Sequence, residues 1–215
     1  MSGVDIPSGA VVEAAHSLRA ARPVGRALVV GTSGWAKWAR REFAPAALAR
    51  MDAAQFAEWK DAGPPELEQN YDLIVVSEGL EVGPLAQSLE RLGKVRSLLA
   101  SDGLGLFVTR PMAYPLRVDD GPTPVGPFDA LLFPHAARMG DLGRAARDRL
   151  MLSPLSWRYM FEQAGFSVLE ISGAEPEGRA ADLRRVHGSR LVHFDEEALC
   201  SSAVSFLVST DGGSR

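Results

Sequence analysis

Two apolar runs, Arg26-Ala-Leu-Val-Val-Gly31 and Tyr71-Asp-Leu-Ile-Val-Val-Ser77, decide the fold of this chain. Each is a short stretch of mostly branched apolar residues that ends at a small residue. Such runs are typical of strands that are covered on both faces, as in a parallel sheet. Leu104-Gly-Leu-Phe-Val-Thr109 has the same character. We therefore expect these three runs to be adjacent parallel strands.

Helical patterns alternate with these strands. The longest begins at Pro84, which is a favoured residue at a helix start, and carries the apolar stripe Leu85, Leu89, Leu92, Val95 and Leu99. The predicted helices cover residues 9–21, 35–43, 84–100 and 153–164. Strands that alternate with helices predict an α/β fold with a doubly wound, mostly parallel sheet.

Two further runs, Phe166–Ile171 and Ala203–Ser209, predict additional strands, the second of them antiparallel at an edge of the sheet. Asp102-Gly103 predicts a turn between the long helix and the third strand. The segment from Ala46 to Lys60 is ambiguous. It fits either an amphipathic helix or a short strand, Leu48 to Met51, that ends at Asp52.

Composition indicates one ordinary globular domain over residues 1–215, with a helical N-terminal segment (1–25) and a flexible tail (210–215). The net charge of −4 argues against a nucleic-acid surface as the main partner. Cys200 is the only cysteine, so the chain has no internal disulfide. No stretch has the length and hydropathy of a membrane span, and we expect a cytoplasmic protein.

Residues 111–152 break the regular pattern with many Pro and Gly residues. A segment of this length between regular elements usually carries function, and this one starts at the carboxyl end of a predicted strand. We expect it to form a cap that contacts a small-molecule substrate or a protein partner. His135 lies in it and is a candidate general base, although a single His beside an apolar residue is more often a packed, hydrogen-bonded side chain.

Ligands of doubly wound sheets bind beyond the carboxyl ends of the strands. Two segments of this sequence have that position: Gly31-Thr32-Ser33-Gly34 after the first strand, and Ser77 to Glu81 after the second. Glu78 and Glu81 would add carboxylates there. The His and Cys residues lack the spacing of a metal site, so we expect none.

Four segments, in this order along residues 26 to 171, resemble the class I S-adenosylmethionine-dependent methyltransferases of the small-molecule type. Ala27 to Gly34 is similar to the glycine loop after the first strand of that family, and Tyr71 to Glu81 to its fourth-strand motif. Leu98 to Val108 resembles the helix, turn and fifth strand. Ser153 to Ile171 resembles the last helix and the sixth strand.

The resemblance implies a methyltransferase that uses S-adenosylmethionine and a small-molecule or a lipid- or sugar-linked methyl acceptor. The residues implied as cofactor contacts are Gly31, Thr32, Ser33, Gly34, Asp52, Ala53, Ser77 and Glu78. Asp52 remains open between three roles. It could bind the ribose after a second strand, bind the adenine with Ala53 after a third strand, or cap a helix.

The glycine loop departs from the family pattern. Val29 stands where the family has an acidic residue, and Ser33 and Trp35 stand where it has glycines. The stretch from Arg26 to Ser77 has only 52 residues, which predicts that one strand–helix unit of the family's first half is absent or shortened. Weak cofactor binding is therefore expected, and the alternative is a non-catalytic protein of the same fold that acts as a subunit, scaffold or regulator. A nucleotide-binding oxidoreductase is disfavoured because Gly31-x-x-Gly34 lacks the dinucleotide-binding spacing.

Overall fold

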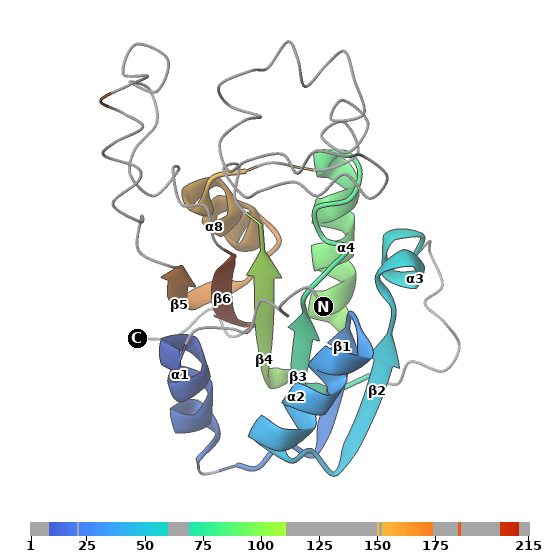
Figure 1. Cartoon of the computed structure of the whole chain (residues 1–215), viewed down its shortest axis with the longest axis vertical. Coiled ribbons are helices and arrows are strands. Elements are labelled where there is room, and N and C mark those ends of the chain that lie inside the picture. Colours follow the sequence, from blue (N-terminus) through green and yellow to red (C-terminus); the bar gives the residue numbers. More distant parts are fainter. Residues whose placement is uncertain are drawn as a thin grey trace.

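A computed structural model describes residues 9–20, 22–59, 69–110, 150, 152–173, 185 and 203–210. These residues build one six-stranded sheet in the order β2-β1-β3-β4-β6-β5 (Figure 1). The strands are β1 (Arg26–Val30), β2 (Ala47–Met51), β3 (Tyr71–Val76), β4 (Leu99–Thr109), β5 (Ser167–Gly173) and β6 (Val204–Ser209). The helices are α1 (Gly9–Arg19), α2 (Ser33–Phe43), α3 (Ala53–Ala57), α4 (Leu85–Leu98) and α8 (Pro154–Gln163). The predicted α/β class is confirmed.

The centre of the sheet is parallel. β1 pairs with both β2 and β3, and β3 pairs with β4, all in the same direction. The prediction that the three apolar runs are adjacent parallel strands is confirmed. The ambiguous segment contains β2, so the strand interpretation of Leu48 to Met51 is the correct one.

The antiparallel strand β6 is not at the edge where we expected it. It pairs with β4 on one side and with β5 on the other, which leaves β5 as the edge strand. The burial of the two strands agrees with these places: Val204 to Val208 are all buried, whereas every residue of β5 is half-buried or exposed. The expected antiparallel direction is confirmed and the expected edge position is wrong.

The two faces of the sheet carry different helices. One face packs against α1 and α2 through a core that includes Val11, Ala15, Trp38 and Phe43. The other packs against α3, α4 and α8 through a core that includes Phe56, Leu92, Val95, Trp157 and Phe161. This double covering explains the continuous apolar runs in β1, β3 and β4. Among the described residues, no helix has the length and apolar character needed to span a bilayer.

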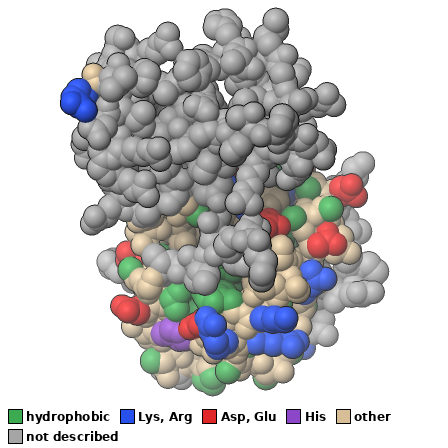
Figure 2. Space-filling view, viewed as in Figure 1, with side chains coloured by type: hydrophobic (Ala, Val, Ile, Leu, Met, Phe, Trp, Pro, Cys, Tyr) green, Lys and Arg blue, Asp and Glu red, His purple; other side chains and the backbone are tan. Residues whose placement is uncertain are grey.

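Helix α2 is amphipathic, and its apolar side packs against the sheet. Trp35, Trp38 and Phe43 are buried, and Trp38 contacts both other rings edge-on, with centroid separations of 5.4 Å to Trp35 and 5.7 Å to Phe43. Its exposed residues include Lys37, Arg40 and Arg41. Figure 2 shows basic side chains gathered on the lower part of this view of the molecule, where α2 lies in Figure 1.

The buried stripe of α4 is shifted from the predicted one. Leu85 is 47% exposed and Leu89 is half-buried. The residues of α4 that are buried are Ser88, Arg91, Leu92, Val95 and Leu98. The buried side of α4 therefore contains an arginine and a serine, whereas the sequence predicted only apolar residues there.

The first residues of β4 also differ from the prediction. Asp102 and Gly103 lie inside the strand, where a bulge lets Leu99 pair with Tyr71 and Leu104 pair with Leu73. A Cβ on Gly103 would lie 2.8 Å from the carbonyl oxygen of Tyr71, so the bulge needs glycine there. The predicted turn is therefore a bulge in the strand.

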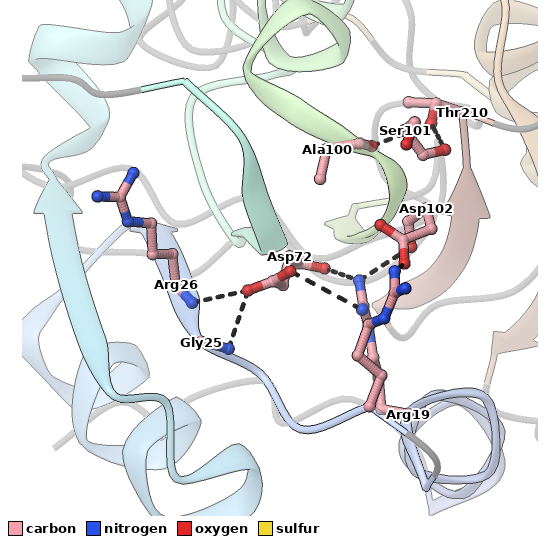
Figure 3. A network of polar contacts seen from close by, with 9 residues as sticks. Arg19, Gly25, Arg26, Asp72, Ala100, Ser101, Asp102 and Thr210 are labelled. Carbon is pink, nitrogen blue, oxygen red and sulfur yellow. Dashed lines mark hydrogen bonds and ion pairs between the residues drawn. The ribbon is translucent and has the colours of Figure 1, made fainter.

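A polar network joins α1 to the amino ends of three strands (Figure 3). The Asp72 carboxylate accepts hydrogen bonds from the backbone N–H groups of Gly25 and Arg26, each at 2.8 Å. The buried Arg19 guanidinium donates to the backbone carbonyls of Asp72 and Asp102, the second at 2.9 Å. Arg22 pairs with the Asp102 carboxylate. This network lies at the edge of the sheet opposite the strand ends where ligands bind.

Candidate functional site

Three neighbouring strands end side by side at the carboxyl edge of the sheet. Val30 at the end of β1 is aligned with Met51 of β2 and with Val76 of β3. The next residues continue the pairing: Gly31 N–H donates to the Met51 carbonyl at 2.9 Å, and Ser77 N–H donates to the Val30 carbonyl at 3.0 Å. Gly31, Asp52 and Ser77, each predicted as a site residue, therefore meet at one edge.

Gly31 has a conformation and a neighbour that only glycine tolerates. Its φ is +145°, and a Cβ there would lie 2.1 Å from Ser77 Oγ. The Ser77 hydroxyl is buried and donates to the Val30 carbonyl at 3.0 Å. Ser77 therefore contributes by holding β1 and β3 together at this edge, and its hydroxyl is already engaged with the backbone.

The chain turns from Gly31 directly into α2. Thr32 is the N-cap residue but its side chain makes no capping hydrogen bond, and both Thr32 and Ser33 are exposed. The N–H groups of Trp35 and Ala36 donate to the Thr32 carbonyl. The earlier N–H groups of a helix, here those of Ser33 and Gly34, have no acceptor within the helix. Two hydroxyls and two N–H donors therefore lie at this end of α2.

Asp52 follows β2 and caps α3. Its Oδ1 accepts from Gln55 N–H at 2.7 Å, and the Gln55 side chain accepts from Asp52 N–H at 3.1 Å, which completes a capping box. The helix-cap role is thus confirmed, and β2 is the second strand of the chain, beside β1. Asp52 is exposed, and its Oδ2 has no hydrogen-bond partner among the described residues.

The loop after β3, residues 77–83, packs against the start of α3. Gly79 has φ +88°, and a Cβ there would lie 3.0 Å from the Ala53 carbonyl and 3.1 Å from the Phe56 ring. Close packing of Gly79 on α3 brings Ala53 and the half-buried Glu78 to the same edge. The eight predicted contact residues therefore lie at the same edge of the sheet.

Glu81 joins this loop to the end of β4. It is buried, and its Oε1 accepts from Arg110 N–H at 2.7 Å, while Oε2 lies 3.7 Å from Arg110 Nη1. The Glu81 backbone carbonyl accepts from Leu150 N–H at 2.5 Å. Glu81 thus anchors both Arg110 and Leu150, on either side of residues 111–149.

One cation reaches the site from β2. Arg50 is exposed, and its Nη1 donates to the Gly31 carbonyl at 3.4 Å. Its guanidinium therefore extends across the ends of β2 and β1. Arg50 was not predicted as a site residue, although its place two residues before Asp52 at the end of a strand was an available signal.

The departures from the glycine pattern have a structural explanation. Trp35 is buried and contacts Trp38 edge-on, and its indole packs beside Gly31, where a Cβ would lie 3.7 Å from Trp35 Cδ1. Val29 is fully buried in the same core. The acidic position of the family is therefore filled here by a core residue. Ser33, at the second departure, is exposed at the start of α2.

His135 and the predicted cap (111–152) fall outside the described residues, apart from Leu150 and Leu152. Within the described ranges, no group of three or more His, Cys, Asp or Glu residues could hold a metal ion. The catalytic role of His135 stays a prediction.

No family model and no curated protein matches this chain. Solved structures of methyltransferase type do match. A cyclopropane synthase of Mycobacterium tuberculosis is 13% identical, with a TM-score of 0.53 over 93% of this chain and 82% of that one. An S-adenosylmethionine-dependent methyltransferase of Mesorhizobium loti is 16% identical, with a TM-score of 0.51 over 96% and 99% of the two chains.

A third match is the phosphoethanolamine N-methyltransferase 2 of Haemonchus contortus, solved in complex with S-adenosyl-L-methionine. It is 11% identical, with a TM-score of 0.51 over 93% of this chain and 52% of that one. The strand that resembles the family's fourth strand is the third strand here, so the described residues contain one strand fewer before it. With that difference, the chain has the fold of the class I S-adenosylmethionine-dependent methyltransferases.

Proposed function

We propose that this chain binds S-adenosylmethionine at the carboxyl ends of β1, β2 and β3 and transfers its methyl group to an acceptor. The observation that carries the proposal is the meeting of Gly31, Asp52 and the 77–83 loop at one edge. Two of these segments approach each other so closely that a Cβ on Gly31 would overlap Ser77 Oγ. Gly31 thus lets β1 and β3 end directly against each other, and the carboxyl ends of such adjacent parallel strands are where doubly wound sheets bind their ligands.

The residues at this edge fit the cofactor in charge and in hydrogen-bonding capacity. Asp52 Oδ2 is available as an acceptor for ribose hydroxyls, because only Oδ1 is engaged in capping α3. The N–H groups of Ser33 and Gly34, with the exposed hydroxyl of Thr32, provide donors for a carboxylate. Glu78 offers a further acceptor at the end of β3.

S-Adenosylmethionine supplies an electrophilic methyl group on a sulfonium. Methyl transfer needs alignment of the acceptor with this group more than it needs acid–base side chains. The described residues can hold the cofactor in a fixed orientation. We propose that residues 111–152 add the contacts to a small-molecule or a lipid- or sugar-linked acceptor, with His135 as the base where the acceptor must lose a proton.

A second function is favoured by a specific observation: Val29 is a core residue, so the family's acidic residue has no equivalent in the described site. Losing one charge-assisted hydrogen bond costs about 1.5–3 kcal/mol. A protein with so reduced a site could serve as a non-catalytic subunit or scaffold, with residues 111–152 as the contact to its partner.

Calorimetric titration of the purified chain with S-adenosylmethionine and with S-adenosylhomocysteine distinguishes these functions. We expect saturable binding of both with dissociation constants of about 10 μM or weaker, from the loss of roughly one decade per 1.4 kcal/mol. No binding at millimolar ligand contradicts the methyltransferase proposal and favours the non-catalytic alternative.

A further inference from the structure

We infer that Arg91 is a positioning residue that holds the 77–83 loop and α3 in the arrangement the cofactor site requires. The inference rests on the proposed function. Arg91 lies on α4, and its hydrogen bonds within the described residues go to the 77–83 loop, to α3 and to Gln87. Its role is to fix the backbone that forms one wall of the site.

The contacts of Arg91 are almost all with backbone carbonyls. The residue is 4% exposed. Nη1 donates to the carbonyl of Gly79 at 3.3 Å and to that of Val82. Nη2 donates to the carbonyl of Ala57 at 2.8 Å and to Gln87 Oε1 at 3.3 Å. One guanidinium thus binds two points of the loop and the end of α3.

These carbonyls belong to the two segments whose other ends are predicted cofactor contacts. Ala57 ends the short helix that begins after Asp52, and Gly79 follows Ser77 and Glu78 directly. On the front of the loop, Gly79 packs against the Ala53 carbonyl. Arg91 on α4 therefore fixes the separation between the loop and α3. The Ser88 hydroxyl, also on α4, holds the loop as well by donating to the Leu80 carbonyl at 2.7 Å.

Among the described residues, no carboxylate lies within ion-pair distance of Arg91, and the neighbouring Glu90 pairs with Lys94 at 2.6 Å. Burial lowers the pKa of Arg91, and the charge of Glu90 partly opposes this effect. A guanidinium remains protonated in proteins, so the helix carries a buried charge in its packed stripe. An apolar residue could fill this stripe without that desolvation cost. What it could not do is bind three backbone carbonyls in a fixed fork.

Arg19 provides a matched control at the opposite edge of the sheet. It is 8% exposed, burial lowers its pKa, and its Nη2 donates to the carbonyls of Asp72 and Asp102 (Figure 3). It shares the burial and the carbonyl contacts of Arg91, differs from it in lying 4.0 Å from the Asp72 carboxylate, and touches no segment of the site. A variant that only destabilises the fold should behave in the same way at either position.

The test compares Arg91→Met and Arg91→Lys with Arg19→Met and Arg19→Lys in the full chain. S-Adenosylhomocysteine binding is measured by calorimetry at a temperature where each variant is folded. We expect the dissociation constant to rise at least tenfold in both Arg91 variants and less than twofold in both Arg19 variants. Lysine keeps the charge but cannot fork, so it should not restore affinity. Where Arg91→Met does not fold, Arg91→Lys gives the comparison.

Amide hydrogen exchange on the ligand-free variants gives a second readout. Exchange in residues 53–58 and 77–83 should rise in the Arg91 variants and stay unchanged in the Arg19 variants. Unchanged affinity at Arg91, or an equal loss at Arg19, overturns the inference while the proposed function stands. A wild-type chain that binds no cofactor overturns the proposed function, and the exchange contrast then still decides whether Arg91 positions the loop.

Discussion

At the scale of single residues, Gly31 is the position where the site is least tolerant of change. Gly31→Ala would place a Cβ 2.1 Å from Ser77 Oγ, in a backbone whose φ is +145°. We expect a lower melting temperature and loss of S-adenosylhomocysteine binding. Gly93→Ala is the matched control, since a Cβ on this exposed α4 glycine meets nothing within 4 Å. It should stabilise the chain by about 0.5–1 kcal/mol. Thermal unfolding of both variants checks the contrast.

Val29 tests whether the missing acidic residue can simply be restored. Val29 is fully buried among apolar side chains, so Val29→Asp would bury a carboxylate without an ion-pair partner. We expect a loss of about 3–5 kcal/mol at pH 7, judged from buried charges left unpaired. Burial raises the pKa of such a carboxyl, so the loss should shrink as the pH falls toward 4. Urea unfolding at both pH values measures this. Tighter cofactor binding with undiminished stability would contradict the placement of Val29 in the core.

Two substitutions of Asp52 distinguish its role as a helix cap from a role in ligand binding. Asp52→Asn keeps a good N-cap residue, whereas Asp52→Ala loses the capping box and about 1 kcal/mol of stability. If the carboxylate also binds the ribose, Asn should weaken S-adenosylhomocysteine binding by up to about tenfold without a change in melting temperature, because only the charge is lost. Calorimetry and thermal unfolding of the same two samples decide it. Equal affinity of Asp52→Asn and wild type would leave Asp52 as a cap alone.

At the scale of elements, the existence of the buried strands could be predicted from the sequence. The position of a strand among its neighbours in the sheet could not. β1 and β3 were predictable because both faces of each strand are covered and the side chains are apolar from Ala27 to Val30 and from Leu73 to Val76. The place of β6 was not, since a strand between β4 and β5 and a strand at the edge can have the same apolar run. The Asp102-Gly103 bulge has the composition of a turn, and only its pairing with β3 distinguishes the two.

The candidate site shows the same division. Gly31 and Ser77 were found because the ends of buried strands are visible in the sequence. Arg91 was missed because it lies outside the apolar stripe predicted for this helix, where an arginine is expected to face solvent, and the carbonyls that it binds belong to other segments of the chain. A polar residue at a buried helical spacing, as with Ser88 and Arg91, was the available signal.

At the scale of the whole molecule, binding of S-adenosylhomocysteine should raise the melting temperature. A ligand that binds only the folded chain stabilises it by about 2.7 kcal/mol at a hundredfold excess over its dissociation constant. For a chain of 215 residues this corresponds to a rise in melting temperature of roughly 5–10 °C. Thermal unfolding with and without S-adenosylhomocysteine measures the shift, and adenine at the same concentration controls for unspecific effects. A chain whose melting temperature does not move at millimolar ligand lacks the proposed site.

The two residues that flank positions 111–149, Arg110 and Leu150, both bind Glu81. Arg110 N–H donates to Glu81 Oε1 at 2.7 Å and Leu150 N–H donates to the Glu81 carbonyl at 2.5 Å. Two N–H groups bound to one glutamate lie close enough for a linker of about five Gly and Ser residues to join them, since such chains reach about 5–6 Å per square root of residue number.

Replacing residues 111–149 by this linker should therefore leave the sheet folded and the cofactor affinity within about threefold of wild type. The proposed function assigns the acceptor or partner contacts to the removed segment, so methyl transfer should be lost while S-adenosylhomocysteine still binds. Circular dichroism, calorimetry and a methyl-transfer assay on the same preparation separate these outcomes. Glu81→Gln, which keeps the shape and an acceptor oxygen at Arg110 but removes the charge, tests the anchor itself. Full activity after the replacement would place the acceptor site elsewhere, and an unfolded product would show that these residues belong to the core.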